Sequence, residues 1–245
     1  TLACALVAAK AGVPIGHVEA GLRSFDRTMP EEINRIVTDA LADLLFTTCT
    51  DADENLRREG VAPQKIHFVG NVMIDTLLAS LPLAAERRTA ERLGLVPGGY
   101  AAVTIHRPTN VDEPAGLERV VTILRALAGR LPVVFPVHPR TARRAQELGL
   151  DAVLRDCPGL HVVEPMRYLE FVDLLRTARL VLTDSGGVQE ETTILGVPCL
   201  TLRPNTERPV TITAGTNELV PLDARGAIEA AQRRLADRAA PQPHR

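Results

Sequence analysis

Residues 180–191 read Leu-Val-Leu-Thr-Asp-Ser-Gly-Gly-Val-Gln-Glu-Glu, an apolar run that passes through a turn directly into a helical pattern. The apolar run is typical of a strand buried on both faces of a parallel sheet. Backbone N–H groups at the start of the following helix are unpaired and lie at the positive end of its dipole, so they bind phosphate. Two glycines, Gly186 and Gly187, let the backbone approach an anion closely. The stretch predicts a strand–turn–helix unit with an anion site at its turn.

Two interpretations of this turn stay open on these residues alone. Ser185 either donates to a phosphate oxygen or is an ordinary helix N-cap, because serine is common at that position. Glu191 lies one helical turn further on, where its carboxylate can accept hydrogen bonds from the hydroxyls of a ribose. The spacing does not distinguish a phosphate-binding turn from an ordinary N-cap. Evidence for one or the other has to come from other segments of the chain.

Strand patterns alternate with helical patterns along the whole chain. Strands are expected at residues 16–19, 44–48, 66–69, 101–105, 133–137, 161–163, 180–183 and 199–202. Helices are expected at residues 1–11, 31–45, 52–58, 72–81, 117–130, 142–148, 169–177, 188–195 and 224–236. Such alternation is typical of doubly wound α/β units with parallel sheets.

The composition shifts between about Asn71 and Gly99, and a domain boundary is expected near residues 70–82. We expect the remainder of an N-terminal domain at residues 1–75, a C-terminal domain at 76–225, and a last helix with a frayed tail at 226–245. The second half has five expected strands and the first half only three. Because the chain also starts without Met and inside a helical pattern, we interpret it as a fragment that lacks its N-terminal part.

The overall composition excludes several classes of protein. The formal net charge of -2 gives no reason to expect nucleic acid or an anionic membrane as partner. Only 3% of residues are aromatic and none is Trp, which argues against a platform for stacking bases. The four cysteines are far apart, so free thiols are expected rather than a zinc or disulfide framework, and the histidines show no metal-binding spacing. We find no signal peptide and no long apolar run, so no membrane span is expected.

Two glutamates are candidate acid–base groups. Glu19 closes an otherwise apolar strand, where a carboxylate is costly unless it is paired or used. Glu31 follows Pro30 at the start of a helix, where the helix dipole and an i,i+4 pair with Arg35 explain it without any function. Two carboxylates that share a cleft can divide into an acid and a base. Glu19 is therefore the stronger candidate of the two.

Basic residues follow several of the expected strands. Arg203 and Arg208 lie in a proline-rich loop after the strand at 199–202, and an arginine there can pair with a diphosphate. His106 and His138 each end an apolar strand beside an arginine. Each residue alone is explained equally well as a solvated or structural side chain. Their repetition at equivalent strand ends indicates an anion-binding rim.

Nine short strings carry a resemblance to a known family. Each is weak alone, but their order and spacing together are specific. They are G-H-V-E-A-G-L-R (16–23), P-E-E-I-N-R (30–35), F-V-G-N-V-M-I-D (68–75), T-I-H-R (104–107), P-V-H-P (136–139), Y-L-E-F (168–171), L-T-D-S-G-G-V-Q-E-E (182–191), T-E-R-P (206–209) and T-A-G-T (213–216). Over essentially its whole length the chain resembles the non-hydrolysing UDP-N-acetylglucosamine (UDP-GlcNAc) 2-epimerases.

The resemblance implies an α/β fold of two Rossmann-like domains with a cleft between them, as in B-type glycosyltransferases, with the first domain incomplete here. It implies that UDP binds mainly to the second domain. The positions that match the family's nucleotide-sugar-binding residues are His106, Phe171, Ser185, Gly186, Gly187, Glu191 and Arg208. Glu19, Glu31 and His106 match its catalytic residues, and a further catalytic Asp is expected upstream of Thr1.

The family's reaction interconverts UDP-GlcNAc and UDP-ManNAc, which supplies ManNAc units for cell-surface polysaccharide. UDP is eliminated with the C2 proton to give 2-acetamidoglucal, and UDP and a proton are then added back. The resemblance implies an isomerase with no cofactor and no metal, in the cytoplasm and as a homodimer. The alternatives are a hydrolysing epimerase or a glycosyltransferase that uses a UDP-sugar on the same scaffold, and a nucleotide-sugar sensor without turnover.

Overall fold

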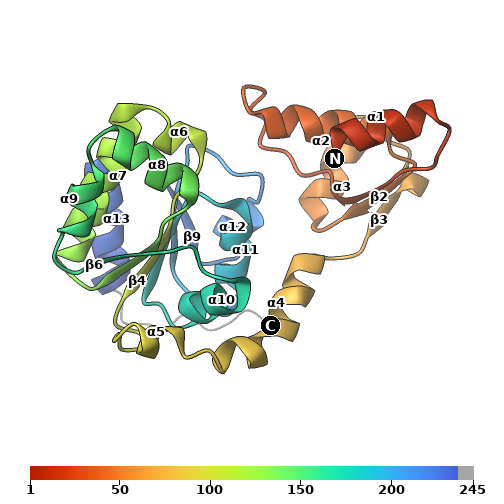
Figure 1. The fold of residues 1–245 in the computed structure, drawn as a ribbon. Coiled ribbons are helices and arrows are strands. Elements are labelled where there is room, and N and C mark those ends of the chain that lie inside the picture. The colour runs from red at the N-terminus through yellow and green to blue at the C-terminus, as the bar shows by residue number, and fades with distance from the viewer. Residues whose placement is uncertain (237–245) are drawn as a thin grey trace. The chain divides into compact units, whose positions relative to one another are not determined.

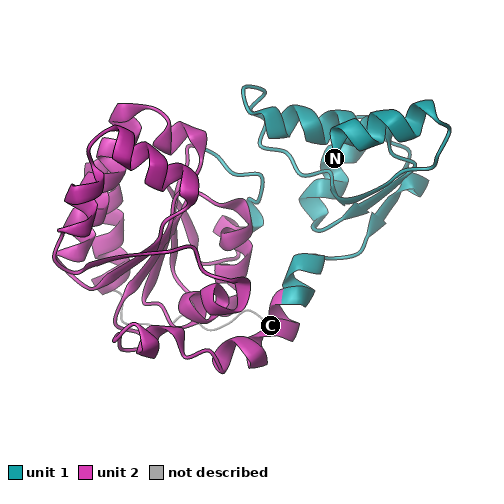
Figure 2. Cartoon of the chain, viewed as in Figure 1, with its two compact units in different colours: residues 1–76, 205–210 teal, residues 77–204, 211–245 magenta. Residues whose placement is uncertain are grey.

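The computed structural model describes residues 1–236, which form two compact units (Figures 1 and 2). Unit 1 comprises residues 1–76 and 205–210, and unit 2 comprises residues 77–204 and the described residues from 211 onward. The division at Thr76 lies inside the expected boundary region of 70–82. Residues 205–210, which we expected in the C-terminal domain, group with unit 1 instead. The expected frayed tail beyond Ala236 lies outside the described residues.

Unit 1 is built on a three-stranded parallel sheet in the order β1-β2-β3. The strands are β1 (Gly16–Ala20), β2 (Leu44–Thr47) and β3 (Ile66–Phe68). The helical elements of residues 1–65 are α1 (Leu2–Lys10), α2 (Pro30–Leu41), α3 (Thr50–Arg58) and the 3-10 turn η1 (Pro63–Lys65). The buried core of this unit is small and consists of Ala20, Ala42, Leu45 and Leu56.

Strand β1 is only partly buried, and of its five residues Ala20 alone is fully buried. One expectation for unit 1 is wrong. The helix expected at 31–45 ends at Leu41, since the N–H groups of Asp43 and Leu44 donate to the carbonyl of Ile15. This pairing turns the chain out of the helix and into β2.

Unit 2 is built on a six-stranded parallel sheet in the order β6-β5-β4-β7-β8-β9. The strands are β4 (Ala101–Thr104), β5 (Val133–Pro136), β6 (Leu160–Val163), β7 (Leu180–Thr183), β8 (Cys199–Leu202) and β9 (Asn217–Val220). All residues of β5, β7 and β8 are buried, which confirms the strands buried on both faces that the apolar runs predict. The α/β class with parallel sheets is likewise confirmed.

Helices cover both faces of the larger sheet (Figure 1). On one face, α7 (Pro114–Ala128) and α13 (Ala224–Ala236) pack with Ala101 and Val103 in one hydrophobic cluster. On the other face, α10 (Tyr168–Arg176) and α11 (Gly186–Leu195) pack with Ala102 in a second cluster. Successive residues of β4 thus point into different cores, as the period of two in a strand requires.

The structure adds elements that the sequence pattern does not show. Strand β9 is a sixth strand of the sheet where five were expected, and it pairs with β8 from Cys199↔Asn217 to Leu202↔Val220. Four short helices also went unpredicted because four or five residues are too few to show a helical period. They are α5 (Thr89–Arg92), α6 (Pro108–Val111), α9 (Asp151–Arg155) and α12 (Val210–Thr213).

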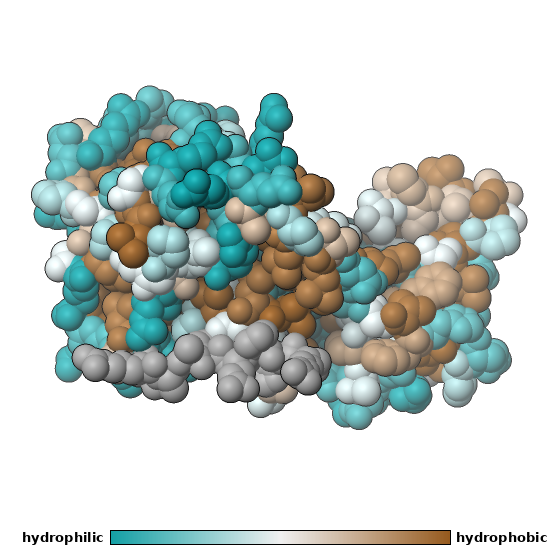
Figure 3. Space-filling view, turned by 90° about the horizontal axis from the view of Figure 1, so that it is seen from below, coloured by the Kyte–Doolittle hydropathy of each residue, from teal (hydrophilic) through white to brown (hydrophobic). Residues whose placement is uncertain are grey.

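Helix α4 (Val72–Ala85) contains the division between the two units and includes Pro82. Leu77 and Ala84 on this helix are fully buried, whereas Leu78 and Leu83 are exposed. Figure 3 shows hydrophobic residues gathered on the face seen from below.

Among residues 1–236 no helix combines the length and the apolar character needed to cross a membrane. All four cysteines have free thiols, as expected.

Helices α8 (Pro139–Glu147) and α9 lie in the chain between β5 and the edge strand β6. Parallel strands end at the same edge of a sheet, so the residues that follow β4, β5, β7 and β8 meet there. This edge is where open α/β sheets bind ligands.

Candidate functional site

Asp184 ties two of these strand ends together in unit 2. It follows β7, is fully buried, and lies beside the end of β4, because Thr104 pairs with Thr183. Its carboxylate accepts hydrogen bonds from the backbone N–H groups of His106 (3.0 Å) and Arg107 (2.8 Å). The side-chain amide of Asn110 donates to the same carboxylate at 3.0 Å. The loop after β4 is therefore held against the turn that begins at Ser185.

His106 receives its position and part of its electrostatic environment from Asp184. Its Nδ1 lies 3.2 Å from Oδ1 of Asp184, and its ring centroid lies 5.5 Å from that of His138. Burial lowers the pKa of His106; the charge of Asp184 raises it, and His138, Arg107 and Arg140 lower it further. The net shift is downward, so the neutral imidazole is the main form at neutral pH.

His138, the second strand-end histidine, has a structural task. It is the N-cap residue of α8, and its Nδ1 accepts a hydrogen bond from the backbone N–H of Arg140 at 3.2 Å. Arg140 in turn pairs with Asp112. His106 and His138 thus lie at adjacent strand ends, with His138 occupied at Nδ1 by its own helix, and the anion-binding rim stays a prediction.

Ser185, Gly186 and Gly187 lie at the start of α11. Ser185 is the N-cap residue by position, but its side chain makes no capping hydrogen bond. Its backbone N–H donates instead to Oγ1 of Thr183 at 3.0 Å. The position agrees with the ordinary N-cap interpretation, whereas the hydroxyl is not used as a cap. The first turn of α11 has the properties of an anion site.

Glu191 and Phe171 come from the neighbouring helices α11 and α10. Glu191 is buried, and the hydroxyl of Tyr168 donates to its Oε1 at 3.3 Å. Burial raises the pKa of Glu191 to about 7; Tyr168 opposes this shift and the charge of Glu190 adds to it. Phe171 is half-buried against the second hydrophobic cluster, one helical turn from Tyr168. A ligand hydroxyl at Glu191 would meet a carboxyl group that ionises near neutral pH.

In unit 1, Asp39 on α2 is the centre of a buried hydrogen-bond network. Its carboxylate lies 2.5 Å from Nδ1 of His17 and 2.7 Å from Nη2 of Arg23, and it accepts from the N–H of Gly21 at 3.1 Å. Arg23 also pairs with both oxygens of Glu59, at 2.7 and 2.6 Å. Burial lowers the pKa of Arg23, but the bonds to Glu59 and Asp39 outweigh it and raise the pKa. The strand end and the loop after it are therefore rigidly held.

Glu19 lies within this frame in an unusual backbone conformation. Its φ is 64°, in the left-handed region, and the pairing of β1 with β2 is irregular between Val18 and Ala20. Such bulges redirect a side chain, and non-glycine residues with this conformation concentrate at functional sites. Gly21 has to be glycine, because a Cβ there would lie 2.4 Å from the carbonyl oxygen of Ala52.

Arg208 forms an ion pair with Glu19 in unit 1. Its Nη2 lies 3.8 Å from Oε2 of Glu19, and its Nη1 lies 2.7 Å from Oε1 of Glu207. Arg208 is mostly buried, and Glu19 keeps 31% of its side chain exposed. Both residues line one pocket of unit 1, together with His17 and Arg35.

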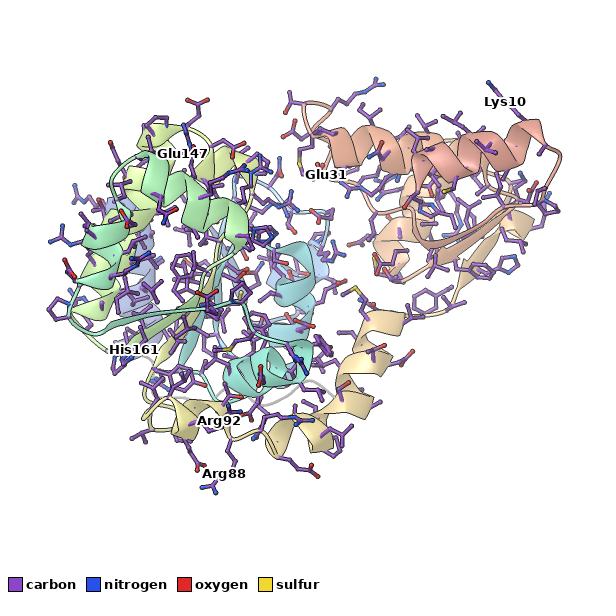
Figure 4. All side chains as sticks on the ribbon, viewed as in Figure 1. Lys10, Glu31, Arg88, Arg92, Glu147 and His161 are labelled. Carbon is purple, nitrogen blue, oxygen red and sulfur yellow. The ribbon has the colours of Figure 1, made fainter. Side chains whose placement is uncertain are left out.

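Glu31 lines an adjoining pocket of the same unit. It is exposed in the first turn of α2, where Figure 4 labels it. The two pockets share Thr1, His17 and Arg35 among their lining residues. Glu19 and Glu31 therefore line neighbouring pockets of one unit, although no contact joins the two carboxylates.

The expected pair between Glu31 and Arg35 is wrong. Arg35 pairs instead with Glu32, at 2.7 Å, and the oxygens of Glu32 also accept from the backbone N–H groups of Ser24 and Phe25. Burial raises the pKa of Glu32, but these N–H groups and Arg35 outweigh it and lower the pKa. Glu32 is thus a buried structural carboxylate, which leaves Glu31 without its expected partner.

The predicted site residues fall into two sets. Unit 2 contains His106, Phe171, Ser185, Gly186, Gly187 and Glu191. Unit 1 contains Glu19, Glu31 and Arg208, the last of which we expected with the nucleotide-binding residues of the other domain. Among residues 1–236 no group of three or more His, Cys, Asp or Glu side chains is arranged to hold a metal ion.

The family model for UDP-N-acetylglucosamine 2-epimerases matches residues 1–245. The chain belongs to this epimerase family. The UDP-N-acetylglucosamine 2-epimerase of Methanococcus maripaludis is 40% identical over 239 residues, covering 96% of this chain and 65% of that relative. That of Methanocaldococcus jannaschii is 44% identical over 224 residues, covering 89% and 61%. The chain thus spans less than two thirds of the length of these epimerases.

Another relative in the epimerase family has a different substrate in its name. The UDP-2,3-diacetamido-2,3-dideoxy-D-glucuronate 2-epimerase of Pseudomonas aeruginosa is 45% identical over 224 residues, covering 90% of this chain and 60% of the relative. It is about as similar to this chain as the two archaeal epimerases are.

Solved epimerase structures share the fold. The M. jannaschii UDP-GlcNAc 2-epimerase in complex with UDP-GlcNAc and UDP has a TM-score of 0.91 at 42% identity, covering 99% of this chain and 68% of that one. The Neisseria meningitidis enzyme bound to UDP-GlcNAc has a TM-score of 0.86 at 32% identity, covering 95% and 64%. The family and the α/β fold class that the nine strings predict are confirmed.

Three epimerase residues described above were missed by sequence reasoning. Asp184 stands inside the string L-T-D-S-G-G at the end of a buried strand, so the argument applied to Glu19 would have found it. Tyr168 stands in Y-L-E-F, three residues before Phe171 and on the same side of the helix. Asp39 lies in no string and carries no local signal.

Proposed function

We propose that this protein is a non-hydrolysing epimerase that interconverts UDP-GlcNAc and UDP-ManNAc. Membership of the epimerase family supports the reaction type. The observation that carries the proposal is the presence of Glu19 and Glu31 in adjoining pockets of one unit. Inverting a carbon that bears a proton needs one group to take the proton and another to return one, and carboxylates are suited to both tasks.

In this proposal unit 2 binds the nucleotide. The first turn of α11, with Ser185, Gly186 and Gly187, holds the diphosphate, because its N–H groups and the helix dipole favour an anion. Glu191 accepts hydrogen bonds from the ribose, and Phe171 contacts the nucleoside. His106 donates to the diphosphate as its charge increases. Because Nδ1 of His106 faces the carboxylate of Asp184, it is the imidazolium that donates from Nε2, and the charge of Asp184 favours that form.

The proposed chemistry couples two bond changes. The C2 proton of the sugar is weakly acidic, so its transfer to a carboxylate has to accompany breakage of the bond between C1 and the diphosphate oxygen. The electron pair of the C2–H bond forms the C1–C2 double bond of 2-acetamidoglucal. UDP leaves with the electron pair of the bond between C1 and the diphosphate oxygen. Groups that bind the diphosphate stabilise the charge that appears on it, and within unit 2 we assign this task to the α11 turn and His106.

The experiment is to incubate the protein with UDP-GlcNAc in deuterated water and to follow the sugar by NMR. We expect UDP-ManNAc with an intact diphosphate and deuterium at C2. Free ManNAc together with UDP would indicate a hydrolysing epimerase instead. Conversion only after an acceptor is added would indicate a glycosyltransferase, and binding of UDP-GlcNAc without any conversion would indicate a sensor.

A second candidate substrate is favoured by the similarity to the P. aeruginosa enzyme. In that case the same inversion at C2 would act on a UDP-sugar with a second acetamido group and a carboxylate. Measuring kcat/KM for both substrates separates the two candidates. If kcat/KM is at least tenfold higher for the diacetamido uronate, that UDP-sugar and not UDP-GlcNAc is the substrate.

We further propose that the protein is a cytoplasmic homodimer. Four free thiols suit a reducing compartment. Analytical ultracentrifugation of the purified protein tests the oligomeric state. A sedimentation coefficient of a monomer across the micromolar range would contradict the dimer.

Glu191 makes the affinity for UDP-GlcNAc depend on pH. The pKa of Glu191 in the protein without ligand is about 7, so its carboxyl group is mainly protonated below that pH. The carboxyl group has to lose this proton before both of its oxygens can accept hydrogen bonds from the ribose hydroxyls. We expect the Kd to rise as the pH falls from 8 to 6, by up to about tenfold for each unit below 7. Calorimetric titration with UDP-GlcNAc measures this, because its diphosphate does not titrate in that range.

The matched variants are Glu191→Gln and Glu190→Gln, neighbouring positions on α11. Glu191→Gln should bind UDP-GlcNAc more weakly at pH 8 and with an affinity that no longer varies with pH. Glu190→Gln should keep the pH dependence. A Kd of Glu191→Gln equal to that of the unsubstituted protein at every pH would exclude a ribose contact.

A further inference from the structure

His17 is fixed by Asp39 across unit 1. The ring lies on β1 and the carboxylate on α2, with Nδ1 and Oδ1 2.5 Å apart. The side chain of His17 is 12% exposed and that of Asp39 is 1% exposed. Because a carboxylate can only accept, Nδ1 is the protonated nitrogen and Nε2 is the one left to act. Arg23 and Gly21 hold the same carboxylate, so the ring cannot turn without breaking this network.

His17 borders both carboxylate pockets. His17 lines the pocket of Glu19 and also the adjoining pocket of Glu31. Arg35, which the two pockets share, pairs with Glu32 and cannot carry a proton between carboxylates at neutral pH. Within the described chain, the ring of His17 makes its hydrogen bond at Nδ1 to Asp39. A proton-carrying group thus lies at the border of the two pockets.

The proposed function creates a need for such a group. In each turnover one carboxylate receives the C2 proton and the other gives a proton to the opposite face of the sugar. The pair is then left with its protonation reversed. Before the next turnover in the same direction, the first carboxyl group has to lose a proton and the second has to gain one.

We propose that His17 carries this proton between Glu19 and Glu31, and that Asp39 is its positioning residue. Nε2 takes the proton from the protonated carboxyl group, so that an O–H bond breaks and an N–H bond forms. The imidazolium is stabilised by the charge of Asp39. The same N–H bond then breaks as the proton passes to the other carboxylate, and the imidazole is neutral again. This inference rests on the proposed epimerase function.

A purely structural role of His17, as a link between β1 and α2, has to be separated from proton transfer. His17→Asn does this, because its side-chain amide can still donate to Asp39 but cannot carry a proton. We expect kcat to fall about 100-fold, within the usual range for acid–base groups, with KM changed less than threefold and the melting temperature nearly unchanged. Imidazole added to the buffer should restore kcat in a saturable way.

The same substitution at His67 on β3, which lines neither carboxylate pocket, is the matched control. His67→Asn should have the kcat of the unsubstituted protein and no response to imidazole. His17→Gln serves as the second variant if His17→Asn does not fold, and it should show the same rescue.

The outcomes separate the inference from the function it rests on. If the unsubstituted protein does not epimerise any UDP-sugar, the proposed function fails and the relay fails with it. If it does epimerise, a kcat of His17→Asn within threefold of the unsubstituted value overturns the relay alone. A fall in kcat that imidazole and other small buffers leave unchanged also overturns it, because it shows a structural role.

Discussion

Glu19→Gln is expected to lose epimerisation by at least about 1,000-fold while it still binds UDP. General acid–base groups contribute 100- to 10,000-fold, and an amide can neither take nor return the C2 proton. The substitution preserves the shape of the side chain in its left-handed backbone conformation (φ 64°). Glu19 is not among the unit 2 residues that we propose to hold UDP, so UDP affinity should stay the same.

Two measurements on the same sample test this expectation. Deuterium incorporation at C2 follows turnover, and calorimetric titration with UDP follows binding. Glu54→Gln is the control, because Glu54 is an exposed glutamate on α3 that pairs with Arg58 at 2.9 Å. Turnover of Glu19→Gln within tenfold of the control would exclude a role in proton transfer.

Asp184→Ala is expected to cause the largest loss of stability, about 3–5 kcal/mol, because it leaves several buried donors without their acceptor. The backbone N–H groups of His106 and Arg107 and the amide of Asn110 all donate to this carboxylate. For a chain of this length such a loss lowers the melting temperature by roughly 10 °C. UDP affinity should fall as well, since His106 is no longer held at the end of β4.

Thermal unfolding compares Asp184→Ala with Asp156→Ala, an exposed aspartate of the same unit. Asp184→Asn adds a second measurement that keeps the shape of the side chain. The charge of Asp184 raises the pKa of His106, so its removal should lower that pKa further in an NMR titration. Equal melting temperatures of the two alanine variants would show that Asp184 does not hold this edge of the sheet.

Most of the fold follows from local patterns. The strand at 180–183 and the helix after it were predicted because three apolar residues and a threonine, followed by Asp-Ser-Gly-Gly, are typical of a strand–turn–helix unit. Strand β9 was missed because Asn217–Val220 has only two apolar residues and becomes a strand by pairing with β8. The end of α2 was misplaced because the carbonyl of Ile15, outside that segment, captures the N–H groups of Asp43 and Leu44.

The candidate site likewise contains residues that the sequence could predict and partners that only the folded structure shows. Glu19, His106, Ser185 and Glu191 were found because each stands at a strand end or helix start that the sequence reveals. Their partners lie far away along the chain. Asp184 is 78 residues from His106, Tyr168 is 23 from Glu191, and Asp39 is 22 from His17. The predicted pair of Glu31 with Arg35 was wrong because Arg35 pairs with the adjacent Glu32. The carboxylate of Glu32 is held in a buried position by hydrogen bonds from the backbone N–H groups of Ser24 and Phe25.

The order of apolar runs, turns and glycines by itself determined an α/β chain, because strand and helix periods and the N–H groups of a helix start depend only on neighbouring residues. The epimerase family followed from the resemblance of the nine strings. Tertiary structure alone decided which carboxylates are structural and which are available. Glu32, Asp39 and Asp184 are held by buried N–H donors, whereas Glu19 and Glu31 remain accessible in their pockets. Burying a charge is unfavourable unless donors surround it, and those donors are brought together only when the chain folds.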